Sequence, residues 1–166
     1  MSSTRLHQVE EFLTILRDQK MSLEREILLT TGLHKTQAEQ RLRLEIKPQL
    51  REYEQEYWQI LADESAITDI SEPVPEVEVV VAEIVKEAEQ LQTSQEYSDE
   101  VLKWLQKIHA EVSKPEEPAA AKLKGALSLL PPFVNLSYEA ELDTEKFLQR
   151  HFPTFRRWSK ALAKKS

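Results

Sequence analysis

The first sixty residues carry an apolar repeat that only long helices can bury. One seam of positions spaced by three and four residues comprises Leu6, Val9, Leu13, Leu16, Lys20, Leu23, Ile27 and Thr30. A second series comprises Leu42, Ile46, Leu50, Tyr53, Tyr57 and Ile60. Such spacing is typical of helices that pack as a coiled coil. The chain from Leu6 to Leu61 is therefore predicted to form two long amphipathic helices.

Gly32 stands between the two series and is one of only two glycines in 166 residues. A glycine can adopt the left-handed conformation that ends a helix, and a connection this short joins antiparallel neighbours. We therefore expect a helical hairpin. Pro48 lies inside the second arm, where a missing backbone N–H and a steric clash predict a kink or a division near Ile46.

The composition favours an all-α fold. With so little glycine the chain lacks most of the tight turns that sheets require. The expected architecture is a long antiparallel, coiled-coil-like hairpin with additional packed helices in an elongated bundle. The chain has no cysteine, which excludes disulfides, thiolate metal sites and a cysteine nucleophile and fits a reducing cytoplasm.

The rest of the chain divides at its prolines. We expect the hairpin over residues 1–66, two further bundle helices over 67–113, a proline-bearing linker over 114–118 and a C-terminal helical segment with a basic tail over 119–166. A valine-rich helix follows Pro75, and the spacing of Thr93 and Glu96 predicts a capping box that opens the next helix, which runs to Val112.

Several features are expected within the C-terminal segment. A helix that begins at Ala119 should be stopped by Pro131 and Pro132, with an irregular loop over residues 133–140. Asp143 should then cap a short helix. The apolar run 127–133 either belongs to the core or inserts shallowly into a membrane, and the core is the stronger alternative.

Charge is unevenly spread along the chain. The formal net charge is −7, yet the last seventeen residues hold six bases and no acid. Such asymmetry indicates an anionic partner for the tail, whether a membrane surface, nucleic acid or an acidic protein face. Nucleic acid is disfavoured because the remaining chain is strongly acidic and repels phosphate.

The candidate contact residues are aromatic and basic side chains interleaved near the C-terminus. They are Phe152, Phe155, Arg156, Arg157, Trp158 and Lys160. One alternative places them on a protein partner or an anionic membrane interface, where each base contributes about 1 kcal/mol. The other docks the aromatic rings on the protein's own helices, with the bases against its acidic face.

No residue set predicts catalysis. The four histidines are scattered, the acids lie on solvated faces, and neither glycine belongs to a phosphate-binding loop. We expect no catalytic residue, no cofactor, no metal site and no small-molecule substrate. The N-terminus has no apolar signal region and no apolar run reaches the ~18 residues of a membrane span, so we expect a cytoplasmic protein.

Several segments carry a resemblance to a known class of protein. They are Leu129-Leu130-Pro131-Pro132-Phe133, residues 136–145 and Phe152-Pro153-Thr154-Phe155. Residues 115–158 resemble a helical accessory region of cyanobacterial proteins that also carry pentapeptide repeats or STAND/NACHT-type NTPase modules. The chain departs from that pattern because it has neither a Walker-A loop nor pentapeptide repeats.

The resemblance implies a non-enzymatic, cytoplasmic accessory module of a bacterial signalling or conflict system, and it assigns no binding residue. Together with the sustained seam it predicts an adaptor that binds a protein partner or self-associates. The alternative is an effector that acts at a membrane surface through its amphipathic basic C-terminal segment.

Overall fold

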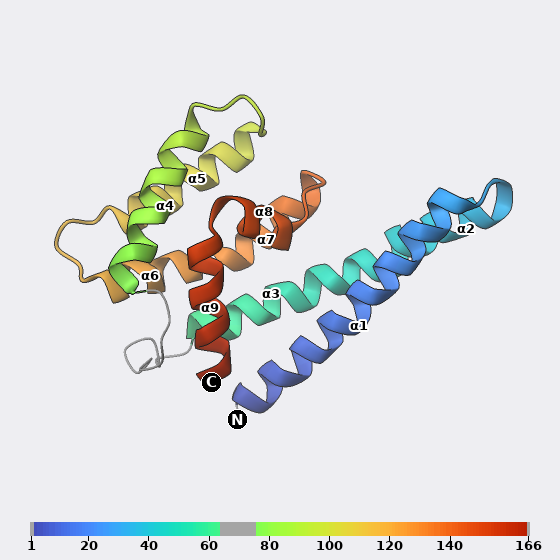
Figure 1. Ribbon diagram of the computed structural model, residues 1–166, viewed down its shortest axis with the longest axis horizontal. Helices are drawn as coiled ribbons and strands as arrows, with labels where there is room; N and C mark the ends of the chain where they lie inside the picture. The colour runs from blue at the N-terminus through green and yellow to red at the C-terminus, as the bar shows by residue number, and fades with distance from the viewer. Residues whose placement is uncertain (1, 64–75, 166) are drawn as a thin grey trace. The chain divides into compact units, whose positions relative to one another are not determined.

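The computed structural model describes residues 2–63 and 76–165, and all regular secondary structure within these ranges is helical (Figure 1). The chain separates into two compact units, Met1–Tyr57 and Trp58–Ser166. The division falls within a helix and lies upstream of residue 66, where the sequence placed the end of its first segment; residues 64–75 lie outside the described ranges. The two units are described in turn.

Unit 1 contains α1 (Ser2–Leu29), α2 (Gly32–Arg41), a π-helical turn η1 (Leu42–Ile46) and most of α3 (Lys47–Asp63). Helix α1 contacts both α2 and η1. Further along, the guanidinium of Arg5 donates to both carboxylate oxygens of Glu56, and Arg17 lies 3.8 Å from Glu54. The rings of Phe12 and Tyr53 are 5.1 Å apart. Low-numbered residues of α1 therefore meet high-numbered residues of α3.

The predicted seam positions lie on the buried sides of these helices. Leu6, Val9, Leu13, Leu16 and Leu23 of α1 are each less than 9% exposed. Leu42, Ile46, Leu50 and Tyr57 on the later helices are buried as well. Lys20, Ile27 and Thr30 are half-buried, as are Tyr53 and Ile60. The apolar repeat of the sequence thus identified the residues that leave water.

The turn between α1 and α2 depends on Gly32. This residue has φ +65°, in the left-handed region that glycine enters without steric cost. Nothing lies within 4 Å of the place a Cβ would occupy. Backbone conformation, rather than close packing, is therefore the reason for glycine at this position, as the sequence predicted.

The π-helical turn accounts for Pro48. A proline inside an α-helix clashes with the carbonyl four residues earlier and removes a hydrogen bond. Just before it, the N–H of Lys47 donates to the carbonyl of Leu42, five residues back, so the helix is locally wider. The helix thus changes type over residues 42–46, directly before Pro48 and where the sequence placed the irregularity.

Unit 2 holds the end of α3 and six further helices within the described residues. They are α4 (Val77–Gln92), α5 (Asp99–Val112), α6 (Ala119–Ser128), α7 (Leu130–Glu139), α8 (Thr144–His151) and α9 (Pro153–Lys165). Helix α4 packs against α5, α6 and α9, and the short helices pack in succession from α6 to α9. Large fully buried side chains include Phe133, Phe152, Phe155 and Trp158.

Two expectations for residues 127–140 are resolved differently. The helix that begins at Ala119 ends at Ser128, before the double proline as predicted, but the loop predicted over residues 133–140 is wrong. Pro131 and Pro132 lie in the first turn of α7, which continues to Glu139. The first turn of a helix has no partners for its N–H groups, so prolines there lose nothing. Leu127, Leu130 and Phe133 are fully buried, so the run belongs to the core.

One further helix start differs from the sequence-based prediction. The capping box at Thr93 and Glu96 is not formed, since Thr93 ends α4 and Ser98 caps α5 by accepting the N–H of Val101. Residues 114–118 join α5 to α6, and these two helices contact each other. Asp143 caps α8 as predicted, accepting the N–H of Lys146 at 3.0 Å.

Candidate interaction surfaces

The aromatic residues predicted to make outside contacts lie in the core of unit 2. Phe152 and Phe155 are each 1% exposed and Trp158 is fully buried. Trp58, at the end of α3, stacks on Phe155 with ring centroids 6.2 Å apart and planes 9° from parallel. These rings hold the C-terminal helices together and reach neither solvent nor a partner while the unit is folded.

The basic residues of the same segment divide into a buried one and exposed ones. Arg156 is 7% exposed, its Nε donates to both oxygens of Glu145 at 2.9 and 3.0 Å, and its guanidinium lies 5.0 Å from the centre of a Trp58 ring. Arg157 and Lys160 are exposed, and Lys160 lies 3.9 Å from Glu145. The arrangement matches the alternative in which rings dock inward and bases meet acids.

Helix α4 supplies the acid that holds the start of α9. The carboxylate of Glu83 accepts the backbone N–H of Thr154 at 2.9 Å and of Phe155 at 3.1 Å. Pro153 has no N–H, and the N–H of Arg156 donates to the carbonyl of Phe152. All early donors of α9 are therefore satisfied, and a negative charge faces the positive end of the helix dipole.

One turn further along α4, Glu87 contacts a buried histidine. His151 is 6% exposed; its Nδ1 lies 3.1 Å from Glu87 and its Nε2 lies 2.6 Å from the hydroxyl of Tyr97. Because a carboxylate only accepts, Nδ1 donates to Glu87, and Nε2 shares a second hydrogen bond with the hydroxyl of Tyr97. The acidic face of α4 thus fastens both the end of α8 and the start of α9.

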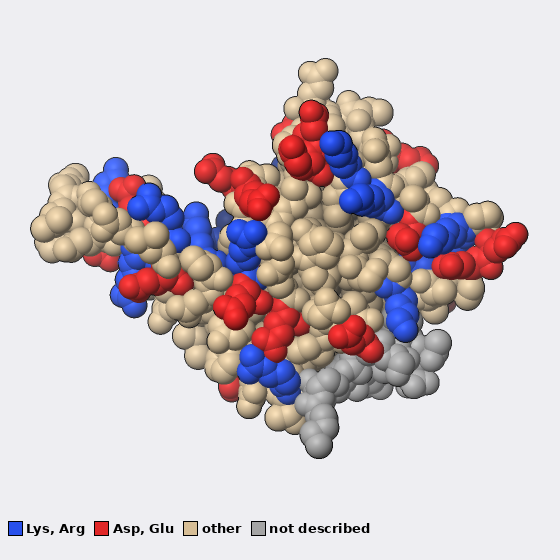
Figure 2. Space-filling view, turned by 180° about the vertical axis from the view of Figure 1, so that it is seen from behind, with Lys and Arg blue, Asp and Glu red and all other residues tan. Residues whose placement is uncertain are grey.

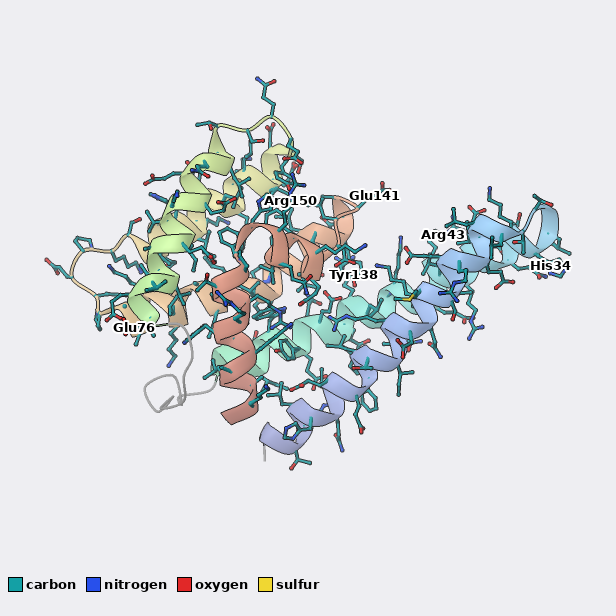
Figure 3. The ribbon with its side chains drawn as sticks, in the orientation of Figure 1. His34, Arg43, Glu76, Tyr138, Glu141 and Arg150 are labelled. Atoms are coloured by element: carbon teal, nitrogen blue, oxygen red, sulfur yellow. The ribbon has the colours of Figure 1, made fainter. Side chains whose placement is uncertain are left out.

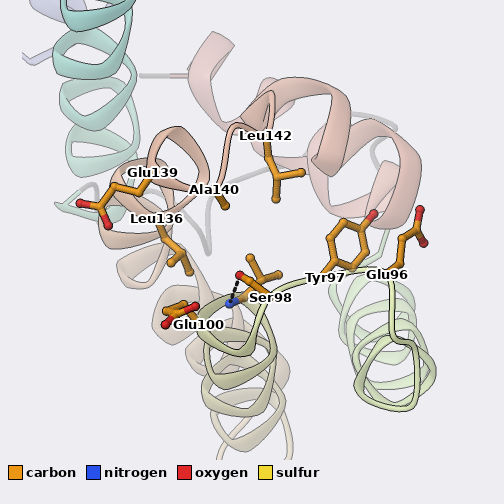
Figure 4. Close-up of a pocket in the computed structure, with 9 residues that line it drawn as sticks. Glu96, Tyr97, Ser98, Glu100, Leu136, Glu139, Ala140 and Leu142 are labelled. Atoms are coloured by element: carbon orange, nitrogen blue, oxygen red, sulfur yellow. Dashed lines mark hydrogen bonds between the residues drawn. The ribbon is translucent and has the colours of Figure 1, made fainter.

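A pocket of about 390 Å³ lies beside Tyr97, between the start of α5 and the end of α7 (Figure 4). We call it the Tyr97 pocket; its lining is Glu96, Tyr97, Ser98, Glu100, Val101, Leu136, Glu139, Ala140 and Leu142. Glu139, Leu136 and Glu100 lie on one side, Tyr97 and Glu96 on the opposite side, and Leu142 between them. The lining therefore mixes apolar side chains with three glutamates.

Electrostatics at the rim favour the neutral phenol of Tyr97. Partial burial raises the pKa of Tyr97, and the negative charges of Glu96 and Glu87 raise it further, while Arg150 lowers it. Arg150 lies 3.1 Å from Glu96. The hydroxyl of Tyr97 thus keeps its proton at neutral pH.

In unit 1 the surface around the α1–α2 turn exposes three leucines. Leu28, Leu29 and Leu33 are 84%, 76% and 70% exposed, and we call them the leucine patch. Figure 2 shows this end of the unit as a largely uncharged surface, and Figure 3 places His34 beside the same turn. Large exposed apolar patches on soluble proteins mark sites of interaction, so this group is a candidate.

The sequence prediction did not single out the leucine patch. Its seam assigned Ile27 and Thr30 to the buried side, and the three leucines fall off that seam on either side of Gly32. The sequence did contain a signal for this patch, because these apolar residues lie close to Gly32 and are not needed for the buried seam. The Tyr97 pocket left no comparable trace, because its lining comes from separate stretches of the chain.

Neither a metal cluster nor a membrane span is found in the part of the chain that the structure describes. No three His, Asp or Glu side chains there are placed to hold a metal ion together. None of the helices in residues 2–63 and 76–165 is long and apolar enough to cross a membrane. The candidate sites in the described residues are therefore the leucine patch and the Tyr97 pocket.

No protein-family model, curated protein or solved structure matches this chain.

Proposed function

We propose that this protein is a non-catalytic helical interaction module that self-associates or binds a protein partner through the leucine patch. In this proposal residues 1–57 form a long antiparallel, coiled-coil-like hairpin that carries the patch at its turn. The buried seam positions and the contacts of Arg5, Phe12 and Arg17 with α3 support the hairpin.

The exposure of the leucine patch is the observation that carries the proposal. Burying a leucine side chain contributes about 1.5–3 kcal/mol relative to leaving it in water. Leu28, Leu29 and Leu33 leave that stabilisation unused in the isolated chain. A partner that covers all three gains it on binding, and because the leucines lie on α1 and α2 little loop ordering is required.

The cellular setting that we propose is based on the resemblance of residues 115–158 to an accessory region of cyanobacterial proteins. We place the module in the bacterial cytoplasm, as an accessory to a signalling or conflict system. Action at a membrane surface is the weaker proposal, because Phe152, Phe155 and Trp158 are buried in the core. Only the exposed bases of α9 would face such a surface.

A concentration series in light scattering tests the proposal. The patch variant carries Leu28→Ser, Leu29→Ser and Leu33→Ser. The matched control carries Ile15→Ser, Met21→Ser and Leu44→Ser, at positions of unit 1 that are 54–64% exposed and lie outside the turn. We expect the wild type and the control to associate alike and the patch variant to remain monomeric, with unchanged helicity by circular dichroism.

Where the wild type is itself monomeric, the same three proteins serve as baits in an affinity experiment. A protein recovered with the wild type and the control, and lost with the patch variant, supports the proposal. A monomeric wild type whose bound proteins do not depend on the patch contradicts it.

A further inference from the structure

We infer that the Tyr97 pocket binds a small organic cation, an ammonium group carried on a short apolar chain. The pocket lies wholly within unit 2, since its lining runs from Glu96 to Leu142. The inference therefore goes beyond the proposed function and does not depend on what the leucine patch binds.

The walls of the pocket leave apolar surface for a ligand to cover. Its volume of about 390 Å³ lies at the lower end of the range of ligand pockets, roughly 300–1,000 Å³, so it suits a small molecule. Leu136 and Leu142 line it and are only half-buried, and Val101 and the ring of Tyr97 complete this part of the lining. A ligand with an apolar chain would remove these side chains from water.

The polar part of the lining selects a positive charge. Glu96, Glu100 and Glu139 contribute carboxylates, and lysine and arginine are absent from the described residues that line the pocket. In Figure 4 Glu100 and Glu139 lie on one side and Tyr97 lies on the opposite side. A cation between them would face both carboxylate charge and an aromatic ring, whereas an anion would be repelled.

Arg150 does not cancel the negative field of these acids. It lies 3.1 Å from Glu96 and is not among the described residues of the lining. Burial raises the pKa of Tyr97, and after burial Glu96 raises it by more than Arg150 lowers it, with a further increase from Glu87. The ring of Tyr97 therefore lies where negative charge predominates.

The spacing of the acids favours an organic cation over a metal ion. A metal ion needs several ligand atoms that converge on one point. No three acidic or histidine side chains in residues 2–63 and 76–165 are placed to hold one. Carboxylates set apart around apolar side chains suit instead a ligand whose charge and apolar body are separate.

A titration with hexylammonium chloride, followed by the backbone amide shifts of isotope-labelled full-length protein, tests the inference. Hexanol is the neutral comparison, and sodium chloride at equal concentration controls for ionic strength. We expect hexylammonium to shift the amides of the lining residues Ser98, Val101 and Ala140 with a dissociation constant of about 1–10 mM. Hexanol should bind at least about threefold more weakly, and added salt should weaken only the cation.

A matched pair of variants locates the charge that the cation meets. Glu100→Gln removes an acid of the lining, whereas Asp99→Asn removes the neighbouring acid, which lies in the same first turn of α5 but outside the described lining. Both positions are exposed, so neither substitution disturbs the core. We expect Glu100→Gln to weaken hexylammonium binding about threefold and Asp99→Asn to weaken it less than about 1.5-fold.

A second ligand distinguishes two sources of such a cation. Lysine that is acetylated at its α-amine and amidated at its carboxyl presents the same ammonium group on the apolar chain of a protein side chain. Tighter binding of this compound than of hexylammonium would assign the pocket to a lysine of a partner protein. Weaker binding would assign it to a free amine.

The inference is overturned if hexanol or sodium chloride shifts the lining amides as strongly as hexylammonium does. Equal weakening by Glu100→Gln and Asp99→Asn would also overturn it, as would unchanged lining amides at tenfold the expected dissociation constant. The proposed function would stand in each case, because the leucine patch lies in unit 1.

Discussion

Glu141 has φ 58°, a left-handed conformation that residues with a Cβ rarely adopt. It follows α7, where the N–H of Leu142 donates to the carbonyl of Ser137 at 2.7 Å and closes the helix end (Figure 3). Helices commonly place glycine at this position. Glu141→Gly should therefore raise the free energy of unfolding by about 0.5–1 kcal/mol in urea denaturation.

The control for this prediction is the neighbour inside the helix. Glu139 is the last residue of α7 and has ordinary helical geometry, so Glu139→Gly should lower stability by about 0.5–1 kcal/mol. Equal effects of the two substitutions would show that the conformation of Glu141 carries no strain.

At the scale of a single titrating group, Tyr97 should make stability depend on alkaline pH. Its pKa is raised above the ordinary value of 10, mainly by burial and then by Glu96 and Glu87. The folded state therefore holds the phenol proton more tightly than the unfolded chain, so this contribution is present below pH 10 and is lost as pH rises through the folded pKa. The free energy of unfolding, plotted against pH across this range, should therefore fall more steeply for the wild type than for Tyr97→Phe. Parallel curves would contradict the shift.

Among the elements, α9 depends on an acid that another helix supplies. Glu83 of α4 accepts two N–H groups at its start, so Glu83→Ala should cost about 1–2 kcal/mol of stability by thermal denaturation. Gln90→Ala, at an exposed position of the same helix, should change stability by less than about 0.5 kcal/mol. A loss no greater than this control's would mean that Glu83 does not hold α9.

Helix α9 offers a second test, with two adjacent arginines. Arg156 binds both oxygens of Glu145 and lies over Trp58, a geometry that lysine cannot reproduce. Arg156→Lys should lower the unfolding free energy by about 1–2 kcal/mol, whereas Arg157→Lys, at an exposed position, should change it by less than about 0.5 kcal/mol. Equivalent melting temperatures for the two variants would argue against a structural role for Arg156.

Element prediction succeeded where one periodic pattern covered a whole helix. The valine-rich α4 was identified from its spacing, and Gly32 from its isolation between two seams. It failed at α7, because a pair of prolines begins a helix as readily as it ends one. The Glu83 contact could not be foreseen, since the sequence does not state which acid of α4 faces α9.

For the whole molecule, the burial of the C-terminal rings bears on the membrane alternative. Helix α9 exposes three bases, Arg157, Lys160 and Lys164. Its aromatic residues Phe155 and Trp158 are buried. Electrostatic attraction alone is opposed by a net charge of −7. We expect the protein to remain in the supernatant with both anionic and neutral liposomes; sedimentation with the anionic ones alone, reversed by salt, would restore the alternative.

The candidate sites could be predicted from the sequence only where they depend on residues that are close together along the chain. A cluster of rings and bases near the C-terminus was readable in the sequence, but whether its rings faced inward depended on packing against Trp58, far away along the chain. The Tyr97 pocket is built from α5, α7 and the turns beside them. Such sites come into being only when the helices pack.

The most direct test of the leucine patch as the binding surface is an environment-sensitive fluorophore placed at the turn. The chain has no cysteine, so Leu33→Cys can be labelled alone, with Ile15→Cys as the matched control at another exposed apolar position of unit 1. As protein concentration, or a captured partner, is raised, emission at residue 33 should shift to the blue and emission at residue 15 should not. An unchanged spectrum at residue 33 under conditions in which the protein associates would contradict the account.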